Sequence, residues 1–273
     1  MTKEKELAMA LPEDWNGVDW RQTLISLPVV TNGIKTIVIN RNRAPHAHKG
    51  YYMFATTYNQ ADPMCSNVLG ATPGEPIVLY IASDVGEGGS LVSQFVFMHE
   101  IGHLRLGHIA GLAPTDTVNN PGTAIPTQYR NEIDADVYSL NHWIAQKTEH
   151  GLRVILAAIN YLNRLNSAGD TTHPASNQRA QFLEQTLDSK TCAIVLLNDN
   201  AISETFARTA LTDFAKRANG WTLNIETALT NANNLGRTAV TPAIKISDAR
   251  QMMNYIEANP TLYKGLKFEV VPT

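Results

Sequence analysis

The chain has 273 residues, of which 44% are hydrophobic, and this is enough to form one large core or two smaller ones. Its 22 basic and 25 acidic residues give a formal net charge of -3, and no basic cluster with interleaved aromatic residues is present, which argues against a nucleic-acid partner. The start of the chain has no apolar segment of signal-peptide length, and no apolar run approaches the ~18 residues that span a bilayer. We therefore expect a soluble, cytoplasmic protein without an integral membrane segment; a secreted or effector role is the alternative.

The chain has only two cysteines, Cys65 and Cys192, which lie far apart in the sequence and outside any C-x-x-C pattern. A fold held together by several disulfide bonds is therefore excluded. Two reduced thiols are the simpler interpretation, and a single bridge between Cys65 and Cys192 is the alternative.

Two short segments in the N-terminal part have the composition of β-strands. Residues 35–40 (KTIVIN) and 76–83 (PIVLYIAS) are rich in β-branched side chains, and residues typical of turns flank them. The region between them contains Pro, Gly and Asn and is predicted to be loop with a short strand. We therefore expect a small sheet in this part of the chain.

After Ser90, which suits a helix N-cap, apolar residues recur with helical spacing. The helix that begins there is predicted to end between Gly107 and Gly111, and a loop containing Pro and Gly follows. Further helices are predicted within residues 129–146, 151–168 and 171–187, the last after a proline-containing opening.

The chain changes character after residue 188. Residues 192–197 (CAIVLL) are predicted to form a strand. Helices are predicted around residues 201–217, 222–234 and 247–258. This C-terminal region carries no motif that we associate with chemistry.

Three of the ionisable residues in the otherwise apolar segment FVFMHEIGHLRLGH, namely His99, Glu100 and His103, form an H-E-x-x-H pattern. His99 and His103 stand four residues apart, so on a helix both imidazoles project from one face and can reach a single metal ion. Glu100 lies beside them, where it can reach a water molecule on the metal without being a ligand. A helix that is apolar on all sides is normally buried, and a metal ion satisfies buried ionisable groups that are otherwise costly. The H-E-x-x-H pattern therefore predicts a zinc site.

A catalytic zinc site needs a third protein ligand. Glu132 and Asp136 are spaced i,i+4 on the predicted helix 129–146, so Glu132 can complete the metal site while Asp136 hydrogen-bonds a ligand imidazole, which we expect to be that of His99. His108 follows His103 by five residues, ~140° around a continued helix, and is therefore expected to point elsewhere.

The combination of HEIGHLRLGH and EIDAD resembles the gluzincin metallopeptidases, in particular the M48 family. The segment THPASNQR matches the HPxxxxR element of M48 proteins, and the resemblance implies that His173 stabilises the oxyanion of the transition state and that Arg179 supports the site. The chain departs from M48 because it has no membrane helices and a shorter spacing before the third ligand. In these respects it is closer to the soluble ImmA/IrrE-like metallopeptidases.

The resemblance implies a predominantly helical α+β protein with a zincin-like metallopeptidase fold, in which a small sheet packs on the HExxH helix. We assign residues 1–188 to this domain. Residues 189–273 form a mostly helical region of unknown role, which is part of the same domain in the alternative.

The expected function is that of a soluble zinc endopeptidase, which hydrolyses peptide bonds through a zinc-activated water with Glu100 as general base. The substrate is then a protein or peptide, and strand 76–83 is our candidate for an exposed edge that pairs with it, although an internal strand is equally compatible with its sequence. Three alternatives stay open: a regulatory ImmA/IrrE-like protease, a non-catalytic zinc-containing binding module, and a metal-dependent hydrolase of another substrate.

Overall fold

The computed structural model describes residues 29–31, 33–42, 53–57, 72, 74–82, 90–109, 111–118, 125–171, 173–197, 203–217, 226, 229–230 and 236–273. Within them the protein is α+β and predominantly helical, as predicted. The chain divides into two compact units, Met1–His142 with Ala157–Ala180 and Trp143–Leu156 with Gln181–Thr273. The proposed domain boundary at residue 188 stays a prediction.

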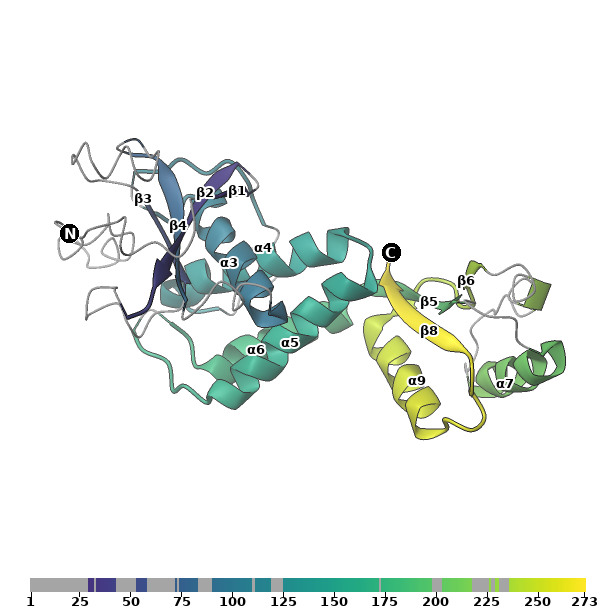
Figure 1. The fold of residues 1–273 in the computed structure, drawn as a ribbon. Coiled ribbons are helices and arrows are strands. Elements are labelled where there is room, and N and C mark those ends of the chain that lie inside the picture. Colours follow the sequence, from purple (N-terminus) through teal and green to yellow (C-terminus); the bar gives the residue numbers. More distant parts are fainter. Residues whose placement is uncertain are drawn as a thin grey trace. The chain divides into compact units, whose positions relative to one another are not determined.

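The first unit contains a small sheet with the strand order β1-β2-β4-β3 (Figure 1). The parallel pair at its centre is formed by β2 (Ile34–Asn40) and β4 (Pro76–Ala82), and both strands were predicted. The outer strands β1 (Val29–Thr31) and β3 (Met53–Thr57) run antiparallel to their neighbours. Helix α3 (Leu91–Arg105) packs on β3 and β4, so the sheet lies on the HExxH helix as expected.

The expectation that strand 76–83 is an exposed edge is wrong. Strand β4 pairs with β2 on one side and with β3 on the other. Ile77, Val78 and Leu79 are 0% exposed, and such a continuous apolar run is typical of a strand that is covered on both faces. Among the described residues, β3 instead forms the edge of the sheet beside β4.

Helix α3 begins at an N-cap that the sequence predicted. The Ser90 side chain accepts a hydrogen bond from the backbone N–H of Ser93 at 3.1 Å. This bond satisfies one of the free N–H groups at the start of the helix. The helix buries apolar residues together with His99 and Glu100, which explains why its sequence shows little separation into an apolar and a polar face.

Helix α4 (Arg130–Ala145) follows a short 3-10 turn, η5 (Thr127–Tyr129), and packs closely on α3. The hydroxyl of Ser139 donates to the backbone carbonyl of Phe95 at 2.8 Å. A β-carbon at Gly102 would lie 3.1 Å from Cβ of Tyr138 and 3.2 Å from Cα of Ala135. Glycine at this position therefore allows the two backbones to approach.

Helices α5 (Glu149–Leu165) and α6 (Ser176–Asp188) occupy the two remaining segments predicted to be helical before residue 188. Both have residues in each unit. Between them, the hydroxyl of Ser176 accepts a hydrogen bond from the N–H of Ser167 at 2.9 Å. This contact holds the two ends of the connection between α5 and α6 together.

The second unit is built around β5 (Thr191–Leu197), which corresponds to the predicted strand 192–197. It pairs antiparallel with β6 (Arg237–Ala239), β7 (Ile244–Lys245) and β8 (Lys267–Pro272). Helices α7 (Glu204–Arg217) and α9 (Ile246–Ala258) were predicted, whereas β8 was not. The predicted helix 222–234 falls mostly outside the described residues.

Aromatic side chains join the helices and strands of this unit. The ring of Phe214 on α7 stacks on that of Phe268 on β8 with centroids 5.8 Å apart.

Cys192 on β5 is buried with a free thiol, whereas Cys65 lies outside the described residues. Throughout the described part of the chain, no helix combines the length and the apolar character that a membrane span requires.

Candidate metal centre

Two helices bring three potential metal ligands together. Nε2 of His99 and Nε2 of His103, both on α3, are 3.0 Å apart. The carboxylate of Glu132 on α4 lies 3.5 Å from the first of these nitrogens and 3.4 Å from the second. Within the described ranges, these three residues form the one group of His, Cys, Asp or Glu side chains with the spacing of a metal site.

The dimensions and chemistry of this group fit zinc. Bond lengths of about 2.0–2.1 Å place neighbouring ligand atoms of a tetrahedral zinc ion ~3.3 Å apart. The two imidazole nitrogens are 3.0 Å apart, and each lies near a different oxygen of Glu132, at 3.5 Å for His99 and 3.4 Å for His103, which is close to this value. Two imidazole nitrogens and one carboxylate oxygen are a donor set that zinc accepts, and they leave a fourth position for water or substrate.

Asp136, one turn beyond Glu132, hydrogen-bonds the first histidine. Its Oδ1 lies 2.8 Å from Nδ1 of His99, which is the contact expected from the sequence. With a metal ion on Nε2, Nδ1–H would donate to this carboxylate and hold the ring with Nε2 toward Glu132. Although burial alone would lower it, Asp136 raises the pKa of His99 to about 10 when no ion is bound.

The Asp136 carboxylate is fully buried and is neutralised by Arg179 on α6. Although burial favours its protonated form, the charge of Arg179 and that of His99 hold the pKa of Asp136 below its usual value. Arg179 also lies 3.6 Å from the carboxylate of Glu132. The arginine of the HPxxxxR element therefore contacts both Glu132 and Asp136 on α4.

Glu132 stays ionised although it is largely buried. Burial would raise its pKa, but hydrogen bonds with His103 and His99 hold the pKa well below its usual range. An ionised carboxylate is the form that binds a metal ion.

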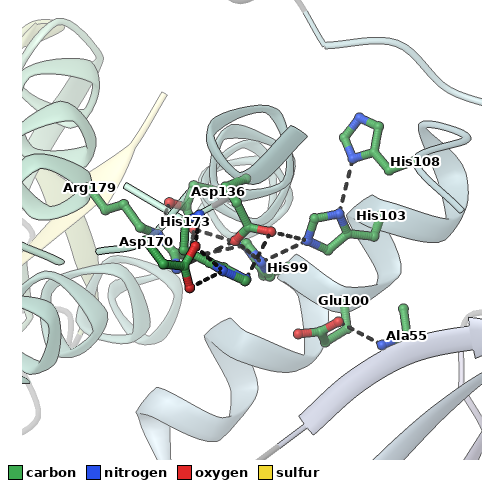
Figure 2. Close-up of polar contacts among 10 residues, drawn as sticks. Ala55, His99, Glu100, His103, His108, Asp136, Asp170, His173 and Arg179 are labelled. Atoms are coloured by element: carbon green, nitrogen blue, oxygen red, sulfur yellow. Dashed lines mark hydrogen bonds and ion pairs between the residues drawn. The ribbon is translucent and has the colours of Figure 1, made fainter. Parts of the chain in front are cut away.

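The second histidine has a partner of a different kind. Nδ1 of His103 lies 3.1 Å from Nδ1 of His108, and Figure 2 shows the His103 ring between His108 and His99. From the sequence, His108 was expected to lie on a continued helix and to point elsewhere. Helix α3 ends before this residue, so the chain returns and the two rings meet.

Glu100 points from α3 toward the sheet. Its Oε2 accepts a hydrogen bond from the backbone N–H of Ala55 on β3 at 2.7 Å (Figure 2). Burial and the charge of Glu132 raise the pKa of Glu100, while His99 and His103 act in the opposite direction. A carboxylate with a raised pKa is suited to accept and return a proton near neutral pH.

His173 approaches the three potential ligands from the connection between α5 and α6. Its Nε2 lies 3.7 Å from the Glu132 carboxylate, and its side chain is 44% exposed. Asp170 accepts a hydrogen bond from the backbone N–H of His173 at 2.7 Å, and its carboxylate also lies 3.1 Å from Nδ1. Asp170 therefore orients the ring so that Nε2 faces the site.

The structure thus brings together all seven residues that the sequence singled out: His99, Glu100, His103, Glu132, Asp136, His173 and Arg179. The contacts of Ala55, His108 and Asp170 were not predicted from the sequence. An aspartate three residues before a histidine is a recognisable turn pattern and could have indicated Asp170. The contact of Ala55 depends on where strand β3 lies relative to α3, and the contact of His108 depends on the turn that ends α3.

Comparison with known proteins adds one independent observation. No curated protein and no solved structure matches the chain. Residues 90–193, which include α3, α4 and α6, match the sequence model of the family Peptidase U49, and this match supports the assignment of a peptidase.

Proposed function

We propose that the protein is a zinc-dependent endopeptidase of the gluzincin type, with His99, His103 and Glu132 as the metal ligands. The observation that carries the proposal is the convergence of these three side chains at zinc-like separations, beside a buried glutamate on the same helix. The family match supports a peptidase, and the donor set supports the metal-dependent class.

Glu100 is the general base in this proposal. A bound zinc ion supplies acidification of the attacking water and polarisation of the scissile carbonyl. Glu100 accepts the proton from the water and returns it to the leaving amine. Its raised pKa favours both steps, and the hydrogen bond from Ala55 fixes one carboxylate oxygen while the other is left for the proton.

His173 stabilises the negative charge that develops on the carbonyl oxygen. Its Nε2 faces Glu132, and Asp170 holds the ring from the opposite nitrogen. Asp136 and Arg179 do not contact the substrate in this proposal. They fix the His99 ring and the position of Glu132.

A polypeptide substrate would bind in an extended conformation beside β3. The N–H of Ala55 on β3 donates to Glu100, so this strand lies beside α3 and the proposed general base. Backbone hydrogen bonds to an edge strand are tolerant of sequence and orient a peptide across the site.

The deciding experiment combines zinc content with cleavage of a denatured protein. Glu100→Gln keeps the size of the side chain and removes the base. We expect about one zinc per chain and at least a ~100-fold loss of cleavage. Glu257→Gln, on the exposed surface of α9, is the matched control and keeps full activity.

Chelation should abolish cleavage by the wild type, and added zinc should restore it. If the protein binds zinc and Glu100→Gln cleaves as fast as the wild type, Glu100 is not the base. If the wild type binds zinc and never cleaves, the site belongs to a binding module. A wild type that binds no zinc would contradict the proposal as a whole.

A further inference from the structure

The end of α3 is a Schellman motif, and its geometry determines where His108 lies. Gly107 has a φ of +69° and donates to the carbonyl of Leu104 at 3.4 Å, and the N–H of His108 donates to the carbonyl of His103 at 3.0 Å. These are the two hydrogen bonds that define the motif. The motif brings the side chain of its last residue against the one five positions earlier, so it pairs His108 with His103.

The turn is held in this conformation from outside. A β-carbon at Gly107 would lie 2.8 Å from the backbone nitrogen of Pro114, so no larger residue fits there without a shift. The carbonyl of Arg105 accepts from the N–H groups of Thr115 and Asp116 at 2.8 and 3.0 Å. The hydroxyl of Tyr138 on α4 donates to Asp116 at 3.1 Å, which ties the returning chain to the helix that carries Glu132.

The contact between the two rings has a defined direction when a metal ion is bound. Nε2 of His103 faces Glu132 and His99, so it is the nitrogen that would bind the ion. A neutral imidazole that binds through Nε2 carries its proton on Nδ1. Nδ1 of His103 therefore donates, and Nδ1 of His108, 3.1 Å away, accepts.

The geometry points to His108 as a positioning residue for the metal ligand His103. This inference rests on the proposed zinc site. His108 accepts the Nδ1–H of His103 as Asp136 accepts that of His99, so each histidine of the H-E-x-x-H pattern has its own partner. A fixed partner sets the tautomer and the ring orientation of a ligating imidazole, and its loss typically lowers metal affinity ~10–100-fold.

The two partners differ in charge. Asp136 is an ionised carboxylate whose charge is offset by the two hydrogen bonds from Arg179. His108 accepts as a neutral imidazole. Neither partner therefore adds net negative charge beside the proposed metal ion. Each can orient its histidine without reducing the positive charge of the site.

Two substitutions at His108 separate hydrogen bonding from packing. Phenylalanine keeps a ring and removes the acceptor. Asparagine places Oδ1 near the position of the imidazole Nδ1 and keeps the acceptor. His150→Phe is the control, because His150 is exposed and its ring lies against Trp143 instead of the metal centre.

Zinc affinity is measured by competition with a chromophoric chelator, and the visible spectrum of the cobalt-substituted protein reports the ligand geometry. We expect His108→Phe to bind zinc ~10–100-fold more weakly and to have an altered cobalt spectrum. His108→Asn and His150→Phe should stay within about threefold of the wild type, because the acceptor is kept in one and the site is untouched in the other.

Thermal unfolding of the metal-free variants shows whether His108→Phe folds. If it does not fold, His108→Asn decides the question. A spectrum and affinity like those of the wild type support the inference, and a ~10–100-fold loss of zinc affinity overturns it. If the wild type binds zinc and His108→Phe binds it equally well, His108 is not a positioning residue although the proposed function stands. If the wild type binds no zinc, both fail together.

Discussion

Arg179 binds Asp136 through two of its nitrogen atoms. Nε donates to Oδ2 at 2.8 Å, and Nη2 donates to Oδ1 at 2.7 Å. The same Oδ1 accepts from Nδ1 of His99, so one buried carboxylate joins α6, α4 and α3. This two-point contact is a strong and directional form of ion pair.

Removal of Arg179 should therefore lower stability. We expect Arg179→Ala to reduce the free energy of unfolding by about 3–5 kcal/mol, because it leaves the Asp136 carboxylate buried without its cation. Denaturant titration of the metal-free protein measures this change. Arg250→Ala, which removes a half-exposed cation 3.5 Å from Glu184 and Asp188, is the control and should cost less than ~1 kcal/mol. Equal losses in the two variants would show that Arg179 has no special role.

Glu132 should be required for metal binding and not for folding. We expect Glu132→Ala to lower the zinc content from about one per chain to a small fraction of that, because only two protein ligands remain. Elemental analysis after gel filtration measures the content, and circular dichroism monitors the fold. Glu257→Ala on the exposed face of α9 serves as the control. A full complement of zinc in Glu132→Ala would identify another residue as the third ligand.

His173 and Asp170 should affect turnover more than substrate binding. We expect His173→Phe to lower kcat about 100-fold with little change in KM or zinc content, since the lost interaction forms in the transition state. Asp170→Asn weakens the hold on the ring and should lower kcat by a smaller factor of about 10. Steady-state cleavage of a peptide substrate tests both. A rise in KM at constant kcat would instead assign His173 to substrate binding.

Cys192 should be unreactive in the folded protein. Burial, with the charge of Asp248, raises the pKa of its thiol to about 12, whereas an unfolded thiol ionises near ~8.5. We expect iodoacetamide to modify it ~100-fold or more slowly in buffer than in denaturant, because the thiolate is the reactive form. A Cys65→Ser background isolates this thiol, and rapid labelling under native conditions would contradict the prediction.

The same shift has a defined effect on stability. The folded state favours the protonated thiol of Cys192. Its contribution to the free energy of unfolding is therefore fully present below pH ~8.5. The contribution is lost as the pH rises above this value, because there the thiol ionises in the unfolded state only. Cys192→Ala should show a smaller decline in unfolding free energy between pH 8 and pH 10 than the parent protein.

The convergence of the candidate metal ligands was predictable because each pair follows from local spacing. His99 and His103 share a helix face, as do Glu132 and Asp136, and an i,i+4 spacing alone places such pairs on one side. What joined the two pairs was the need of a catalytic zinc site for a third protein ligand, and the resemblance to known metallopeptidases agreed with it. The structure places them at the distances that this argument requires.

The contacts that the sequence did not reveal depend on where regular structure ends. A helical wheel places His108 ~140° from His103, but the wheel applies only while the helix continues. The glycine before His108 ends it in a left-handed conformation. Strand β4 was likewise identified as a strand, but not as an internal one, because hydrogen-bond partners of a strand are set by tertiary structure and not by its own residues.

Gly102 has a consequence for the choice of ion. It is not a ligand, yet the missing side chain sets how near the histidines of α3 come to Glu132 on the neighbouring helix. In the proposed zinc site, the separation of the three ligands is thus set by the close approach of the two backbones. A larger residue at this position would spread the donors apart and favour ions of greater radius over zinc.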